Sequence, residues 1–189
     1  MQYSYVITIE RYPGVLRPCA RCGGIKPFVP SGQVRLNAQK KRLDVWLIHK
    51  CRHCGSTWNK EVFSRVSHAR LERGLYERLL ANDEALVRSL AFDAHLHAKA
   101  GAPLRVETLR YAITGDPFPL EAITEPAEVT IACPVPLGVR LSKLLREILG
   151  LSLGQFEEMV AFGALISPDG RDLKRARMET CCTVKVIPR

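Results

Sequence analysis

The sequence contains one short motif, C-x-x-C-G, twice, and this pair limits what the chain can fold into more than any other feature. Cys19 and Cys22 form the first copy, and Cys51 and Cys54 form the second. Two intervening residues allow both sulfurs of a tight turn to face one ion, and the glycine after each copy permits the left-handed backbone of such a turn. Four thiolates form a closed tetrahedral shell without an open position for water. The motifs therefore predict one structural zinc ion rather than a hydrolytic centre.

Two other uses of these four cysteines remain open on the sequence alone. Iron in a rubredoxin-like shell would use the same turns, and two disulfides would use the same residues. The first ten residues have neither a basic lead nor an apolar signal core, and no run approaches the roughly 18 apolar residues of a membrane span. We therefore expect a cytoplasmic protein that does not associate with membranes. Its thiols should stay reduced there, which favours a metal over disulfides.

The spacer between the two motifs predicts an extended hairpin. Cys22 and Cys51 are separated by 28 residues, more than the roughly 15–20 that are usual between such cysteine pairs. Residue patterns predict strands near 3–10, 43–50 and 57–63, and an irregular strand near 26–37 that is interrupted at Pro30-Ser31-Gly32. Strand, turn, hairpin, turn and strand is the layout of a zinc ribbon, which we assign to residues 1–67.

The middle of the chain, residues 68–103, is predicted to be a helical connector. Leucines at helical spacing begin it, and Asn82 is expected to cap the N-terminus of one continuous second helix. His95 and His97 lie close to Asp93 in sequence. A spacing of two places the histidines on different faces of a helix, so we expect no shared site.

The last segment, residues 104–189, is predicted to combine strands with two helices. Leucines in one stripe followed by a glycine predict the first of these helices, and a capping box at Ser152 and Gln155 opens the second. The predicted strands lie near 109–114, 128–133, 164–166 and 184–187, and the helices at about 140–149 and 152–162. The whole chain is therefore predicted to be an α+β protein.

The net charge of +9 is distributed unevenly along the chain. Residues 1–70 carry 13 Lys and Arg against 3 acids, residues 71–133 carry 6 against 10, and residues 134–189 carry 9 against 6. A basic segment at each end favours a polyanionic partner, most simply nucleic acid. A solvated basic surface without a partner is the alternative. The densest positive cluster lies at the predicted hairpin tip and comprises Lys40, Lys41 and Arg42.

The final segment resembles a small RNA-binding domain of bacterial ribosomal small-subunit protein four, some pseudouridine synthases and tyrosyl-tRNA synthetases. The resemblance is carried by R-L-S-K-L-L at 140–145, by Ser152 and by G-A-L-I at 163–166. In that family, basic residues on the first helix and in the loop after the second helix bind structured RNA. The chain has Leu153 and Asp169 where the family usually has arginine and asparagine. The residues implied as RNA contacts are Arg140, Lys143, Arg146, Arg171, Lys174 and Arg175.

Nearly the whole chain is similar to a bacterial family known only as domain of unknown function 1062. The similarity is carried by both cysteine pairs, by the run from Asn37 to Ile48, by Trp58-Asn59, and by the segments 63–66, 82–83 and 91–93. It implies a bacterial metal-binding protein and assigns no activity.

These observations favour a non-enzymatic, zinc-binding protein that binds structured RNA or ribosomal particles. The sequence has no phosphate-cradling glycine loop, no nucleophile elbow and no metal-activating His-Glu pattern, so we assign no catalytic residue. Two alternatives remain: an adaptor that binds a protein partner and has purely structural zinc, and a redox or iron protein. Cys133, Cys181 and Cys182 are expected to be lone cysteines without a ligand role.

Overall fold

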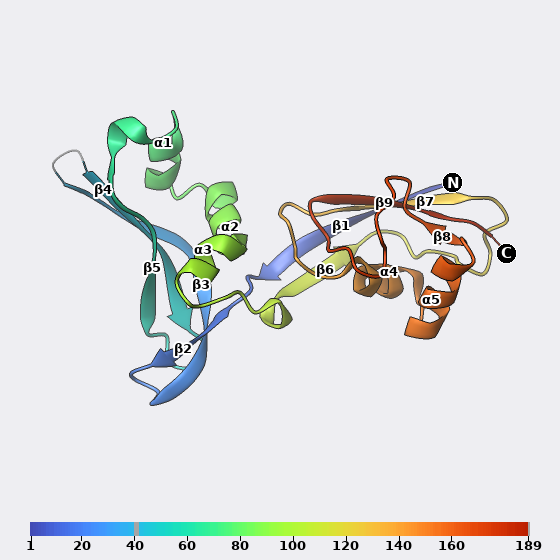
Figure 1. The fold of residues 1–189 in the computed structure, drawn as a ribbon, viewed down its shortest axis with the longest axis horizontal. Helices are drawn as coiled ribbons and strands as arrows, with labels where there is room; N and C mark the ends of the chain where they lie inside the picture. The colour runs from blue at the N-terminus through green and yellow to red at the C-terminus, as the bar shows by residue number, and fades with distance from the viewer. Residues whose placement is uncertain (40–41, 189) are drawn as a thin grey trace. The chain divides into compact units, whose positions relative to one another are not determined.

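The structure is a computed structural model that describes residues 1–39 and 42–188, and the chain divides into two compact units. The knuckle unit is Arg11–Arg110, and the terminal unit combines Met1–Glu10 with Tyr111–Arg189 (Figure 1). The sequence patterns suggest three segments, with boundaries after residues 67 and 103. Contacts between residues group the chain into two units. The first strand belongs to the terminal unit because β1 (Gln2–Arg11) pairs in parallel with β7 (Ala127–Ala132).

The knuckle unit is built on a four-stranded antiparallel sheet in the order β2-β3-β4-β5. On β4, alternate residues from Leu43 to Cys51 are buried, as the period of a half-buried strand requires. The predicted irregularity in the second strand is present as a register shift between Pro30 and Val34. The strands are β2 (Val15–Cys19), β3 (Gly24–Gln39), β4 (Arg42–Cys51) and β5 (Thr57–Ser67).

Three short helices follow the sheet: α1 (Leu75–Leu80), α2 (Glu84–Phe92) and α3 (Ala94–Lys99). α1 and α2 pack against it through apolar side chains, and α3 contacts it through His97 and His49. Leu79 packs with Leu43 of β4, and Val87 and Ala91 pack with Leu47 of the same strand. These contacts join α1 and α2 to the sheet in two small apolar clusters. Short 3₁₀ turns occupy His68–Arg70 and Val106–Thr108.

Two details predicted for the connector are wrong. Asn82 does not cap a helix: it has a left-handed backbone (φ 56°), and its Oδ1 accepts a hydrogen bond from Val34 N at 2.8 Å. Asp83 caps α2 instead, because its carboxylate accepts from Leu86 N. The predicted continuous helix is interrupted at Asp93, whose extended backbone and side-chain cap start α3.

The two ends of the knuckle unit meet within that unit. Arg105 N donates to Gly14 O at 2.8 Å, and Gly14 N donates to Thr108 Oγ1 at 2.6 Å. A Cβ at position 14 would lie only 2.9 Å from Phe28 O, so this approach requires glycine. The chain therefore enters and leaves the unit at a single backbone junction.

The terminal unit contains a five-stranded mixed sheet in the order β6-β1-β7-β9-β8. β7 pairs with β9 in antiparallel register, from Ala127 opposite Val186 to Ala132 opposite Cys181. The remaining strands are β6 (Arg110–Thr114), β8 (Leu165–Ile166) and β9 (Cys181–Val186).

The two predicted helices of this unit are confirmed to within one residue at each end, as α4 (Leu141–Leu149) and α5 (Leu153–Ala161). α4 buries four leucines in one stripe and ends at Gly150, which has a left-handed backbone (φ 67°). The predicted capping box is present: Gln155 N donates to Ser152 Oγ, and Ser152 N donates to Gln155 Oε1. The mixed α and β composition predicted for the chain is likewise confirmed.

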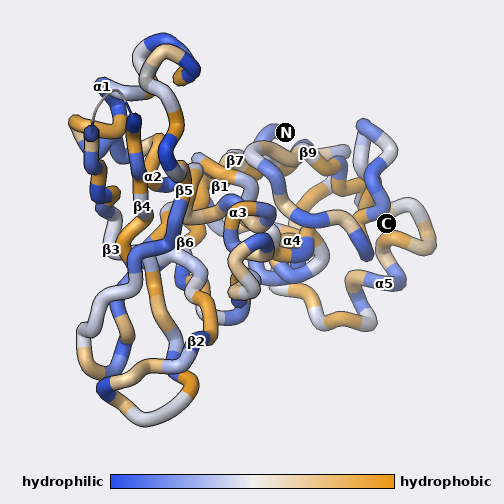
Figure 2. Tube along the Cα trace, turned by 60° about the vertical axis from the view of Figure 1, so that its left-hand side comes forward, coloured by the Kyte–Doolittle hydropathy of each residue, from blue (hydrophilic) through white to orange (hydrophobic). Residues whose placement is uncertain are grey.

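Hydrophobic and hydrophilic residues are interspersed along the trace of both units (Figure 2). Among the described residues, no helix is long and apolar enough to cross a membrane.

Asn82→Ala should lower the free energy of unfolding by about 1–3 kcal/mol. The change removes the acceptor for Val34 N and places alanine in a left-handed backbone, and each effect costs on the order of 1 kcal/mol. Urea denaturation checks this, with Asn37→Ala as the control, since Asn37 is exposed on β3. Equal midpoints for the two variants would contradict the role of Asn82.

Candidate metal centre

Two similar turns, at the ends of β2 and β4, position the four cysteines. β2 ends at Cys19, and Gly23 N donates to Cys19 O at 3.0 Å. β4 ends at Cys51, and Gly55 N donates to Cys51 O at 2.9 Å. Both glycines have positive φ, 66° and 74°, as the repeated motif predicts.

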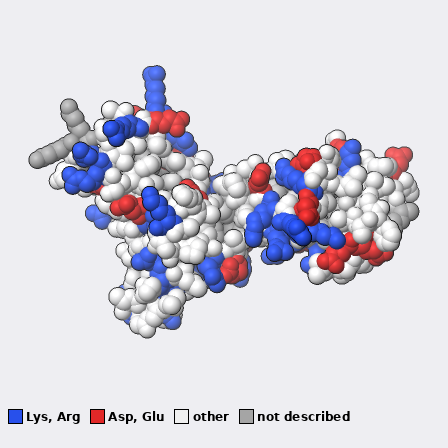
Figure 3. Space-filling view, viewed as in Figure 1, with Lys and Arg blue, Asp and Glu red and all other residues white. Residues whose placement is uncertain are grey.

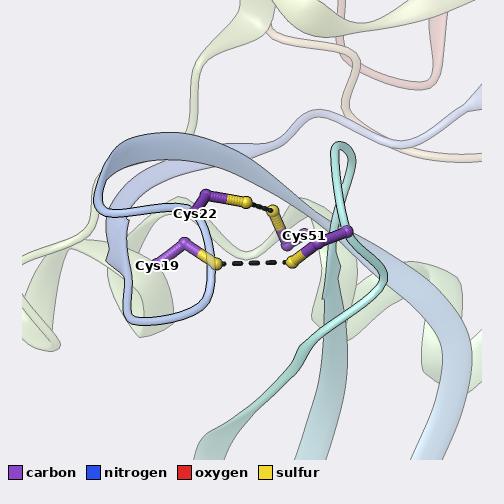
Figure 4. Close-up of side chains that lie close together, drawn as sticks. Cys19, Cys22 and Cys51 are labelled. Atoms are coloured by element: carbon purple, nitrogen blue, oxygen red, sulfur yellow. Dashed lines mark hydrogen bonds between the residues drawn. The ribbon is translucent and has the colours of Figure 1, made fainter.

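The sulfurs of Cys19, Cys22, Cys51 and Cys54 form one cluster. Figure 4 shows the labelled side chains of Cys19, Cys22 and Cys51 lying close together. The Cys19 and Cys54 sulfurs are 3.5 Å apart, those of Cys22 and Cys51 are 3.9 Å apart, and all four lie within 4.8 Å of one another. A tetrahedral ion with bonds of about 2.3 Å would place its sulfurs about 3.8 Å apart. The four residues therefore have the spacing that an ion in a closed shell requires.

The alternative of two disulfides does not hold in the structure, because Cys19, Cys22, Cys51 and Cys54 form no disulfide. Among the described residues, this is the only group of three or more His, Cys, Asp or Glu close enough to hold an ion. Cys19 and Cys51 are buried in a small apolar cluster with Val15, Phe28 and Ala102. Cys22 and Cys54 are partly exposed.

Two of the four thiols, Cys54 and Cys22, have pKa values shifted in opposite directions. Ser56 Oγ lies 3.0 Å from Cys54 Sγ, and this contact is the main cause that lowers the pKa of Cys54 to about 6. The neighbouring Cys54 in turn raises the pKa of Cys22 to about 12, with burial adding to the effect. Without a cation, the cluster therefore resists carrying four negative charges. A divalent ion at its centre would remove this conflict.

The histidines near the motifs lie outside the sulfur shell. His53 is exposed, with Nδ1 3.6 Å from Cys22 Sγ. His49 is buried and faces the buried His97 of α3, with the two Nε2 atoms 3.3 Å apart. Asp93 does not form a site with His95 and His97, because its carboxylate caps α3 and His95 is exposed.

The His49–His97 pair is a feature that sequence reasoning missed. His97 Nδ1 lies 2.8 Å from Asp93 O, His49 Nδ1 lies 3.3 Å from Leu47 O, and the two Nε2 atoms face each other. Burial is the main cause that lowers the pKa of both rings, to about 4 for His49. Lys60 on β5 is also buried, and burial lowers its pKa as well. The alternation of β4 pointed to a buried His49, but nothing in the sequence identified its partner 48 residues away.

The structure places the predicted nucleic-acid contacts in both units. Lys40 and Lys41 lie outside the described residues. Arg42 is exposed in the knuckle unit and donates to Arg65 O. In the terminal unit, Arg140, Lys143, Lys174 and Arg175 are exposed, whereas Arg146 and Arg171 are partly buried.

The fold and the sulfur cluster together define a mixed α and β protein with a four-cysteine site that could hold a metal ion. A family model described as "Protein of unknown function (DUF1062)" matches residues 36–171, and the chain belongs to this family. No curated protein and no solved structure matches the chain. The matched range includes Cys51 and Cys54 and begins after Cys19 and Cys22.

Cys51→Ser should abolish stoichiometric metal binding and make the chain protease-sensitive between residues 19 and 60. Three sulfurs leave the shell open, and structural zinc in small peptides contributes on the order of 10–16 kcal/mol to folding. Elemental analysis of purified protein, with limited proteolysis and mass mapping, checks both effects. Cys181→Ser is the control because Cys181 is free and exposed. Full metal content with unchanged protection in Cys51→Ser protein would refute the site.

The free energy of unfolding should fall as the pH drops from 6.5 towards 4. The native pKa values of His49 and His97 are lowered, so the native state favours neutral rings, while the unfolded chain takes up protons near pH 6.5. The loss for His49 is on the order of 3 kcal/mol. Denaturation at several pH values, with metal content measured at each, checks the slope.

His97→Gln should flatten this pH dependence, and His95→Gln should leave it unchanged because His95 is exposed. Equal slopes in the two variants would show that the buried pair does not cause the effect.

Proposed function

We propose that this chain is a zinc-stabilised, non-enzymatic protein that binds structured RNA or ribosomal particles through the terminal unit. The proposal has two parts: the identity of the ion, and a basic face on the terminal unit. We define the basic face as Arg140, Lys143, Lys174, Arg175 and Arg177.

Zinc is the ion that the donor set favours. Four sulfurs without nitrogen or oxygen ligands suit a soft tetrahedral site, which zinc and iron share. In this proposal the four-stranded sheet with its two cysteine turns is a zinc ribbon. An iron-loaded protein would be coloured, so an absorption spectrum of purified protein separates the two ions.

One contact carries the RNA proposal: an isolated antiparallel bridge between Arg140 and Arg177. Arg140 is the N-cap residue of α4, and Arg177 lies in the loop between β8 and β9. The bridge therefore joins the two segments that the RNA-binding resemblance implies. Both arginines are exposed. Arg177 also donates to Gly138 O, which fixes its side chain near the start of α4. The bridge places two exposed arginines at facing backbone positions, and guanidinium groups suit a phosphate group.

The other members of the basic face, Lys143, Lys174 and Arg175, are exposed to solvent. Lys143 Nζ lies 5.4 Å from the centre of the Tyr111 ring, which supports its chain without neutralising its charge. Asp172 accepts from the backbone N–H groups of Lys174 and Arg175 and so shapes the loop. Its ion pair with Arg175 is loose, at 3.7 Å, and the Arg175 side chain is 90% exposed.

Arg146 and Arg171, the remaining predicted contacts, have structural partners as well. Arg146 Nε donates to Leu151 O, across the turn between α4 and α5. Arg171 pairs with Asp169 at 2.7 Å and donates to Cys181 O. We propose that these two arginines mainly hold the turn and the loop in place, and that the basic face supplies the phosphate contacts.

The charge distribution on the surface supports this assignment. Lys and Arg side chains gather over β6 and α4 on the face of the terminal unit seen in Figure 3. The knuckle unit is also basic and presents Arg42. Contacts from both units to one RNA would raise the affinity through effective concentration.

Neutralising two residues of the basic face should weaken RNA binding and reduce its salt dependence. We expect Arg140→Gln combined with Lys143→Gln to lower the slope of log affinity against log salt by roughly 1.4–1.8, because each lost phosphate contact contributes about 0.7–0.9. Fluorescence anisotropy with a labelled RNA hairpin and with duplex DNA of similar length, at several salt concentrations, measures the slope and the preference for RNA.

Arg70→Gln combined with Arg73→Gln is the control, because it removes the same charge from two exposed residues outside the basic face. Equal slopes in the two double variants would contradict the assigned face. Binding that disappears by physiological salt, without preference for RNA, would contradict the proposed function.

A further inference from the structure

A pocket of about 450 Å³ lies in the terminal unit, between α5, the segment that joins β6 to β7, and the residues that follow β9. Its floor is apolar and is formed by Leu120, Ile123, Leu151, Met159, Ile187 and Pro188. Binding sites for compact apolar groups have volumes of about 300–1,000 Å³. The pocket is therefore large enough to hold a large apolar side chain together with its neighbours.

The rim of the pocket is acidic. The polar lining residues are Glu121, Gln155 and Glu158, and all three are exposed. Glu158 already interacts with another residue of the chain, so Glu121 supplies the carboxylate for an incoming cation. No Lys or Arg of the described residues lines the pocket, although the chain has a net charge of +9. Such a rim attracts a cation next to the apolar group and disfavours an anion such as a nucleic-acid phosphate.

The shape of the site distinguishes a partner protein from a free small molecule. Sites for small ligands bury most of the ligand surface, whereas the rim residues here are exposed and Ile187 keeps 36% of its surface accessible. A small molecule in this pocket would remain partly in water. A protein chain that inserts one side chain can cover the rim with its flanking residues, as the central contacts of protein interfaces do.

We infer that this pocket binds a partner protein through a large apolar side chain flanked by Lys or Arg. The site has the opposite charge to the basic face and is lined by other residues. It therefore stands independently of the proposed RNA binding, and the two can be tested separately.

Calorimetry with short capped peptides and the full-length, metal-loaded chain tests the inference. The probe is acetyl-Lys-Trp-Lys-amide, with acetyl-Lys-Gly-Lys-amide and acetyl-Glu-Trp-Glu-amide as comparisons. We expect the first peptide to bind at least tenfold more tightly than the other two, because only it has both the apolar group and the cations. No measurable binding, or equal binding of the three peptides, would overturn the proposal.

Glu121→Lys and Glu125→Lys form a matched pair of variants. Both residues are exposed in the same segment, and only Glu121 lines the pocket. We expect at least fivefold weaker peptide binding for Glu121→Lys and less than a twofold change for Glu125→Lys, with circular dichroism confirming that both variants fold. Equal losses would show that general charge attracts the peptide and would overturn the site.

Two further measurements complete the test. Free tryptamine binding as tightly as the peptide would overturn a partner protein as the occupant, since it would show a site for small amines. An RNA hairpin that displaces the peptide would overturn the separation of the pocket from the basic face. Peptide binding that persists with RNA present supports the inference, and it does so whether or not RNA itself binds.

Discussion

The crowding of four sulfurs into one small volume is the constraint on which the knuckle unit depends. Each sulfur lies within 4.8 Å of the other three, and the pKa values of Cys54 and Cys22 are shifted in opposite directions. The residues around them form only a small apolar cluster in which two of the ligands are themselves members. At this end of the sheet, the hydrogen bonds of Gly14 with Arg105 and Thr108 add to the small cluster, and a bound cation would add further stability, whereas the opposite end has the helices and their leucines.

Local patterns in the sequence predicted the parts of the structure that local interactions determine. The positive φ of the glycines after each cysteine pair, the buried leucine stripe of α4 and the capping box of α5 all follow from residues within a few positions of one another. The four cysteines were found for the same reason, because a repeated spacing of two encodes a turn of fixed geometry.

The features that the sequence did not predict depend on contacts between distant residues. Asn82 looked like a helix cap because of its neighbours, but its amide binds Val34 in a different element. The partner of His49 lies on α3, and the partner of β1 lies more than a hundred residues further along the chain. In the sequence, nothing separates Arg146 and Arg171 from Arg140 as predicted RNA contacts. In the structure, Arg146 and Arg171 differ because they donate hydrogen bonds to the backbone oxygens of Leu151 and Cys181. Spacing along the chain contains no information about such pairings.

The order of the two units along the chain connects the cysteine site with the terminal sheet. The knuckle unit is an insertion of residues 11–110 between β1 and β6, two neighbouring strands of the terminal sheet. When the insertion is folded, the junction of Gly14 with Arg105 and Thr108 keeps its two ends together. When it is unfolded, joining those strands means closing a loop of about a hundred residues, an entropic cost on the order of 4 kcal/mol. An ion bound by the cysteines would favour the folded insertion, and through the continuity of the chain it would also favour assembly of the terminal sheet.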